Sequence, residues 1–195
     1  MMNNIAKQNY KTFSIYLLFS LFLTVVGSFF GSFLSPSFFI IAAITSIVMI
    51  FILILSKKNK ILFFIFSLIE GIMLSPLIYH YSNTQLCICL AITFAIVLIF
   101  TILGFLFKDL GFLGKFLLVS LFGYLIITIV NIFMPIPFLS IIGIILFSLY
   151  IMYDINKFKN KANQTLLDHD IVVDVCNVYL DIINLFLNVL GINVD

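Results

Sequence analysis

Charged residues are scarce in this chain. Only 9% of its 195 residues are Asp, Glu, Lys or Arg, whereas 64% are hydrophobic. A soluble globular domain is closer to half apolar and a quarter charged, so this composition excludes a water-soluble fold. The net charge of +2 is too small to support a nucleic-acid partner.

Tryptophan and arginine are absent, and the only cysteines are Cys87, Cys89 and Cys176. Their spacing matches neither a metal-ligand motif nor a disulfide framework, so we interpret them as small apolar packing residues. A cleavable signal peptide is not recognisable, because the first apolar run continues without a small-residue cleavage site. We take that run as the first membrane span.

The chain instead contains apolar runs of about 20 residues, the length that crosses a bilayer core. They lack the polar–apolar alternation of barrel strands. The predicted fold is an all-α polytopic membrane protein with a single transmembrane domain, residues 1–195. Seven spans are predicted, at about 13–34, 37–55, 61–80, 86–107, 116–134, 138–156 and 170–190.

The basic residues fall on alternate connections between these spans. Positive residues gather on the cytoplasmic side of membrane proteins. This predicts a cytoplasmic N-terminus and, after seven spans, a C-terminus outside. The lysines concerned are Lys7, Lys11, Lys57, Lys58, Lys60, Lys108, Lys115, Lys157, Lys159 and Lys161.

The last predicted span differs from the others because polar residues recur along it at steps of three and four. On a helix such positions form one stripe. A span that is polar on one face is predicted to lie inside the bundle, surrounded by the other six. The stripe comprises Asp174, Asn177, Asp181, Asn184 and Asn188.

Three acidic residues are predicted within the membrane: Glu70, Asp154 and Asp181. Because a carboxylate facing lipid costs several kcal/mol, they should face the bundle interior or water. Asp181 lies roughly 16 Å into its span at 1.5 Å per residue, with no lysine at that depth. It is expected to be protonated part of the time, hydrated or bound to an ion. Hydrogen bonding between helices remains an alternative role for the asparagines and for Glu70.

Pro76 lies inside the third predicted span. A proline removes a backbone N–H donor, so it should bend the helix and free a carbonyl oxygen. The neighbouring Ser75 hydroxyl is a candidate donor to that carbonyl.

Three stretches resemble the Bax inhibitor-1 family, also called the transmembrane BAX inhibitor motif family. Residues 177–187 (NVYLDIINLFL) are similar to its last-helix signature, and Tyr153-Asp154 is similar to the Tyr-Asp of its sixth helix. Glu70-Gly71 followed by Leu74-Ser75-Pro76 resembles its third-helix motif. The seven spans and the cytoplasmic N-terminus also fit.

The resemblance implies a central seventh helix ringed by six others, in a bacterial inner membrane. It also implies a pH-sensitive calcium leak channel, not an enzyme, without a cofactor. Asp154 and Asp181 would share a proton, gate the pore and bind Ca²⁺ transiently, since Ca²⁺ prefers oxygen ligands. Candidates for the ion pathway are Glu70, Asp174, Asn177, Asn184 and Asn188.

Two other functions are alternatives to a calcium channel. Some bacterial relatives bind and modulate a membrane-anchored AAA protease, which would make the chain a non-conducting regulator. Intramembrane aspartyl proteases also place Tyr-Asp on one helix and Asp on the next. Their Gly-x-Gly-Asp motif is replaced here by Val178-Tyr179-Leu180 before Asp181, and their Pro-Ala-Leu element is missing, which disfavours proteolysis.

The chain departs from the family at one point. Some members hold the closed state with an arginine on the second helix. Here Lys57 or Lys58 could only substitute by position, because lysine lacks the planar fork that binds a carboxylate.

Overall fold

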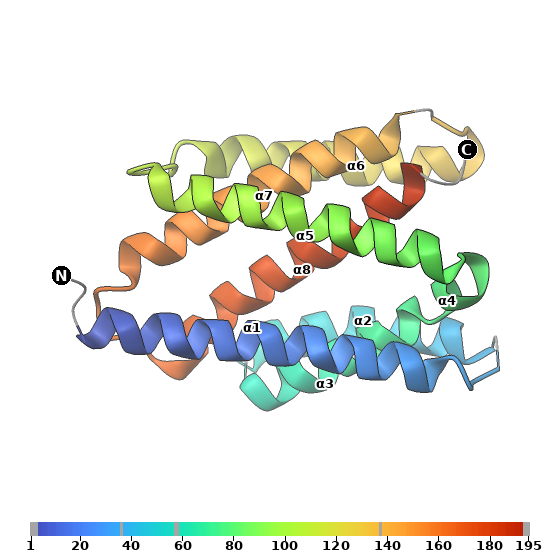
Figure 1. Cartoon of the computed structure of the whole chain (residues 1–195), viewed down its shortest axis with the longest axis horizontal. Coiled ribbons are helices and arrows are strands. Elements are labelled where there is room, and N and C mark those ends of the chain that lie inside the picture. Colours follow the sequence, from blue (N-terminus) through green and yellow to red (C-terminus); the bar gives the residue numbers. More distant parts are fainter. Residues whose placement is uncertain (1–3, 36, 57–58, 137, 193–195) are drawn as a thin grey trace. The chain divides into compact units, whose positions relative to one another are not determined.

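The computed structural model describes residues 4–35, 37–56, 59–136 and 138–192, and within them every regular element is a helix. This confirms the predicted all-α class. The helices follow one another along the chain as α1 (Asn4–Gly31), α2 (Ser37–Leu55), α3 (Lys60–Leu74), α4 (Pro76–His80), α5 (Asn83–Leu106), α6 (Leu113–Phe133), α7 (Leu139–Lys161) and α8 (Asp168–Ile192) (Figure 1).

Six helical segments in the described part of the chain are long and apolar enough to cross a membrane: α1, Lys60–Ile78, α5, α6, α7 and α8. The chain is therefore a multi-pass membrane protein. α2 has 19 residues, but its described apolar segment covers only Ile44–Leu53. A count of seven spans, and the orientation of the termini, stay predictions.

The third predicted span is broken where the sequence suggested. α3 ends at Leu74 and α4 begins at Pro76. The Ser75 hydroxyl donates a hydrogen bond to the Ile72 carbonyl oxygen at 2.6 Å, and the Ser75 backbone N–H reaches the same oxygen at 3.2 Å. Ile72 is the residue whose carbonyl Pro76 cannot serve, so the predicted role of Ser75 is confirmed.

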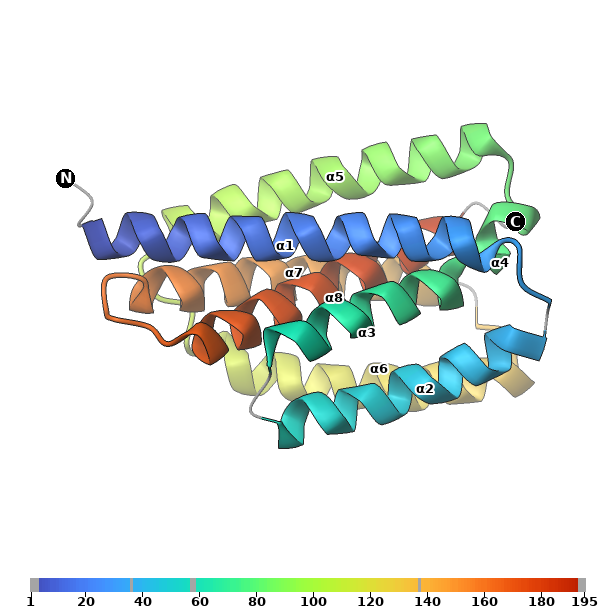
Figure 2. The same cartoon turned by 90° about the horizontal axis from the view of Figure 1, so that it is seen from below.

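The chain divides into two compact units. The first comprises Met1–Asn83 and Ala162–Tyr179, in which α3 packs against both α1 and α2 (Figure 2). α1 and α3 touch through their backbones, because a Cβ on Gly71 would lie 2.1 Å from the Thr24 carbonyl oxygen. Asn9 ties the start of α1 to the segment before α8, donating to the carbonyl oxygens of Ala162 (2.8 Å) and Gln164 (2.9 Å).

The second unit comprises Thr84–Lys161 and Leu180–Asp195, in which α6 packs against α7. The buried side chain of Asn156 joins the end of α5 to α7, as does that of Lys159, whose Nζ donates to the carbonyl oxygens of Phe105 and Phe107. Asn156 Nδ2 donates to the carbonyl oxygens of Gly104 (2.9 Å) and Phe107 (2.7 Å), and its Oδ1 accepts from the Leu110 N–H at 2.9 Å. The buried Asn156 thereby holds the connection between α5 and α6.

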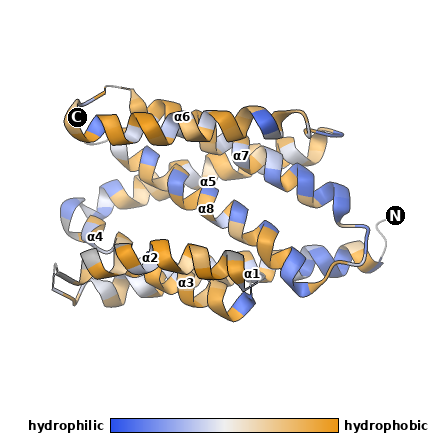
Figure 3. Cartoon of the chain, turned by 180° about the vertical axis from the view of Figure 1, so that it is seen from behind, coloured by the Kyte–Doolittle hydropathy of each residue, from blue (hydrophilic) through white to orange (hydrophobic). Residues whose placement is uncertain are grey.

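α8 is divided between the two units at Tyr179. Along it no residue from Ile171 to Leu190 is exposed, in contrast to the exposed apolar side chains of α5 and α6. Hydrophilic segments recur along α8, whereas α2 and α3 are hydrophobic over most of their length (Figure 3). A central position of α8, a ring of six helices and a single domain stay predictions.

Candidate functional site

The structure brings together the two acids that the sequence analysis paired. Asp154 lies on α7 and Asp181 on α8, both within the second unit, and each is 7% exposed. Their carboxyl groups are close enough for a hydrogen bond between them. Consecutive helices therefore present two acids to each other in a buried environment.

The chemistry of this contact requires a positive charge. Two ionised carboxylates offer only acceptors, so a hydrogen bond between them needs a proton on one. Asp181 Oδ2 is buried and accepts no hydrogen bond from any residue that the structure describes. Asp181 also forms no ion pair within that part of the chain. The pair is suited to hold one proton or to bind a passing cation.

One further polar side chain of α7, that of Tyr150, acts on this pair, and a second, that of Ser148, is buried on the same helix. Tyr150, one turn before Asp154, is close enough to both carboxyl groups to act on them electrostatically. The Ser148 hydroxyl is buried without a hydrogen-bond partner among the described residues. Sequence reasoning missed Tyr150, although its i, i+4 spacing to Asp154 placed both on one helix face.

Asn188 and Asn184 use much of their hydrogen-bonding capacity within the protein. Each Nδ2 donates to the carbonyl oxygen four residues earlier, Asn184 to Leu180 and Asn188 to Asn184, both at 2.8 Å. Asn188 Oδ1 accepts from the Tyr124 hydroxyl of α6 at 2.7 Å. This arrangement favours the helix-packing interpretation for Asn188 and leaves Asn184 Oδ1 as the more available oxygen.

The remaining predicted residues lie in the first unit. Glu70 and Asp174 are buried and Asn177 is half-buried. A pathway that joins them to the aspartate pair stays a prediction. The described residues contain no group of three or more His, Cys, Asp or Glu that could hold a metal. Ca²⁺ takes about six to eight oxygen ligands, so two carboxyl groups suit transient contact better than a resident ion.

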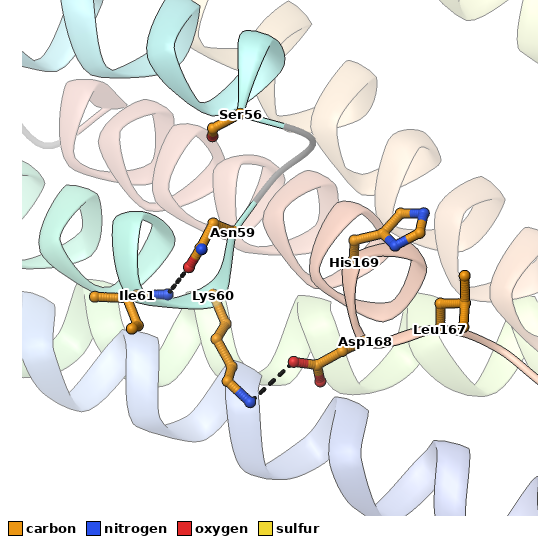
Figure 4. Close-up of a pocket in the computed structure, with 7 residues that line it drawn as sticks. All are labelled: Ser56, Asn59, Lys60, Ile61, Leu167, Asp168 and His169. Atoms are coloured by element: carbon orange, nitrogen blue, oxygen red, sulfur yellow. Dashed lines mark hydrogen bonds and ion pairs between the residues drawn. The ribbon is translucent and has the colours of Figure 1, made fainter.

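A pocket of the first unit lies where α3 and α8 begin (Figure 4). Lys60 Nζ lies 2.9 Å from Asp168 Oδ2, and the Tyr16 hydroxyl donates to Asp168 Oδ1 at 2.7 Å. Both charged side chains are about half exposed, so the ion pair positions the start of α8 more than it stabilises the fold. The proposed latch residues Lys57 and Lys58 lie outside the described residues.

This chain belongs to the class of multi-pass helical membrane proteins, and it has a buried pair of acids on its last two helices. The family described as "Inhibitor of apoptosis-promoting Bax1" matches residues 2–193. The chain therefore belongs to the Bax inhibitor family, as the sequence motifs indicated.

Relatives of the chain occur in yeast and bacteria. Bax inhibitor 1 of Schizosaccharomyces pombe is 29% identical over 80% of this chain, and inner membrane protein YbhL of Escherichia coli is 28% identical over 69%. The matches span 61% and 62% of these two proteins. An uncharacterised protein of Campylobacter jejuni is 28% identical over 95% of this chain and 86% of its own length.

Proposed function

We propose that this protein is a pH-sensitive calcium leak channel of a bacterial inner membrane, controlled by a proton that Asp154 and Asp181 share. The proposal rests on the contact between these two buried carboxyl groups. The membrane assignment draws on the similarity to the inner membrane protein YbhL, and the cytoplasmic N-terminus on the distribution of lysines.

The proton shared by Asp154 and Asp181 controls the passage of Ca²⁺. With one proton, the pair is held by a hydrogen bond and carries a single negative charge, and the two groups titrate as a unit. Loss of that proton leaves two negative charges in contact. Two unit charges about 4 Å apart repel by roughly 4 kcal/mol at an effective dielectric constant of about 20. Repulsion loosens α7 from the second half of α8 and leaves oxygen ligands for Ca²⁺.

The direction of the effect follows from this sequence of events. Raising the pH removes the shared proton, so Ca²⁺ flux should increase as the pH rises. Asp181 Oδ2, which lacks a partner among the described residues, is the oxygen best placed to meet the ion. Asn184 Oδ1 lies one turn further along the same helix.

The test is Ca²⁺ flux into liposomes that contain the purified full-length chain and an enclosed Ca²⁺ indicator, measured over a series of pH values. Asp181→Asn should flatten the pH response, because an amide cannot share the proton. Asp109→Asn is the matched control: Asp109 is exposed, and its Oδ1 accepts from the Gly111 N–H at 2.8 Å, which an asparagine Oδ1 can also do. An unchanged pH response in Asp181→Asn would refute the shared-proton mechanism.

The hypothesis that the chain regulates a protease predicts a different result in the same liposome flux assay. Absence of flux from the wild-type chain, together with co-purification of a membrane-anchored AAA protease from its native membrane, would replace the channel proposal by that hypothesis.

A further inference from the structure

The first unit contains a second buried carboxyl group, remote in sequence from the aspartate pair. Glu70 of α3 is 6% exposed and forms no ion pair with any residue that the structure describes. Ser46 of α2 faces its carboxyl group, and Tyr179 of α8 is close enough to interact with it electrostatically. An acid enclosed in this way by neutral groups needs a positive charge from elsewhere.

The acceptors around Thr24 favour one direction for the hydrogen bond between Thr24 and Tyr179. Thr24 Oγ1 lies 3.0 Å from the Ser20 carbonyl oxygen, 3.1 Å from the Ser67 carbonyl oxygen and 2.7 Å from Tyr179 Oη. Carbonyl oxygens cannot donate. Thr24 has one hydroxyl proton; if that proton goes to one of the two carbonyl oxygens or is shared between them, Tyr179 donates to Thr24. Tyr179 Oη then has only lone pairs to offer Glu70.

Ser46 supplies a second acceptor. It is 3% exposed, and its Oγ has no hydrogen-bond partner among the described residues, Glu70 included. A hydroxyl oxygen can accept as well as donate. Tyr179 Oη and Ser46 Oγ are thus two neighbouring oxygens that could accept a hydrogen bond from a protonated Glu70.

We propose that Glu70 is a second proton-binding site of this protein, occupied at neutral pH and separate from the aspartate pair. Burying an unpaired carboxylate costs several kcal/mol, and a buried acid avoids this cost by remaining neutral. The groups that face the site are uncharged in the described part of the chain: Thr24 from α1, Ser46 from α2 and Tyr179 from α8, with Cys176 beside Tyr179. The protonated carboxyl group donates to Tyr179 Oη or Ser46 Oγ.

Occupancy of this site bears on α8. Tyr179 hydrogen-bonds α8 to Thr24 of α1, in addition to the bond between Tyr16 and Asp168 at the start of α8, and it lies two residues before Asp181 in sequence. Release of the Glu70 proton would place a negative charge beside the lone pairs of Tyr179 Oη. A change in pH at this site is therefore expected to alter the packing of α8 within the first unit.

Infrared spectroscopy of the full-length chain in lipid nanodiscs tests the proposal, because a protonated carboxyl group has a carbonyl band that an ionised one lacks. The background is Asp154→Asn/Asp181→Asn, which removes the aspartate pair. At neutral pH this background should show a protonated-acid band. Adding Glu70→Gln should remove a component of that band that the matched variant Asp174→Asn, at the other buried acid of the first unit, leaves in place.

A second measurement covers the case in which Glu70→Gln does not fold. Tyr179→Phe and Ser46→Ala each remove one acceptor, so at least one of them should shift the band. Absence of a Glu70-dependent component, or of a shift in both acceptor variants, would overturn the proposal. So would loss of the band on adding Na⁺, K⁺ or Ca²⁺ at constant pH, which would make Glu70 a cation ligand instead.

Discussion

Gly143 of α7 and Asn188 of α8 touch so closely that a Cβ on the glycine would lie 2.0 Å from Asn188 Oδ1. The same Oδ1 accepts the hydrogen bond from Tyr124 of α6. The missing side chain at position 143 therefore gives the Asn188 amide room to join three helices of the second unit.

Gly143→Ala should destabilise the protein. The added methyl group displaces the Asn188 amide from Tyr124, and overpacking of this kind typically costs about 1–3 kcal/mol. Thermal unfolding in detergent should show a lower midpoint. Gly123→Ala in α6 is the matched control, because a Cβ there meets nothing within 4 Å, and alanine favours a helix by about 0.5–1 kcal/mol. Equal midpoints for the two variants would contradict the proposed contact.

Asn156→Ala should destabilise the second unit by a different route. Its side chain satisfies the Leu110 N–H and the carbonyl oxygens at Gly104 and Phe107. A buried group left without its partner costs about 1–3 kcal/mol, so loss of this side chain should lower the unfolding midpoint clearly. Asn163→Ala, at an exposed asparagine, provides the comparison and should leave the midpoint unchanged. Limited proteolysis should also cleave the α5–α6 connection faster in Asn156→Ala.

Hydropathy predicted the helices but not where they end. α1 begins at Asn4 and α7 continues to Lys161, whereas the predicted spans began at 13 and ended at 156. Hydropathy detects only the apolar part of a helix, and both helices extend into polar sequence that contains lysines. Pro76 was informative because a proline acts on its own backbone, whatever lies around it.

The pairing of Asp154 with Asp181 could be predicted because both residues lie in motifs of the family. The role of Asn156 could not be predicted. The backbone groups that Asn156 contacts lie 46 to 52 residues away in sequence, and no local pattern marks such a contact. The same reason hid the contact between Thr24 and Tyr179, which are 155 residues apart. The polar stripe of α8 indicated a buried helix, but it did not indicate which of its residues serve packing.

The contact between Thr24 and Tyr179 should appear as a coupling energy. Tyr179→Phe and Thr24→Val each remove one hydroxyl group of the same buried hydrogen bond, so the double variant should cost less than the sum of the single variants. Residues that share a hydrogen bond typically couple by about 0.5–3 kcal/mol. The measurement is a double-mutant cycle from unfolding in detergent. Tyr16→Phe, which removes an exposed hydrogen bond to Asp168, should cost less than Tyr179→Phe. Additive single variants would contradict a direct bond.

The two aspartates should not act independently in the flux assay. If they share one proton, Asp154→Asn and Asp181→Asn each abolish the sharing, and the double variant has nothing further to lose. The pH dependence of Ca²⁺ flux should therefore be equally flat in all three variants, and groups that act as a unit give this kind of non-additivity. Flux at one fixed pH can still differ between them, because each variant leaves a different carboxyl group in place. A double variant whose pH response changes by the sum of two partial changes would mean that each acid titrates alone, so that the contact between Asp154 and Asp181 would not be the pH sensor.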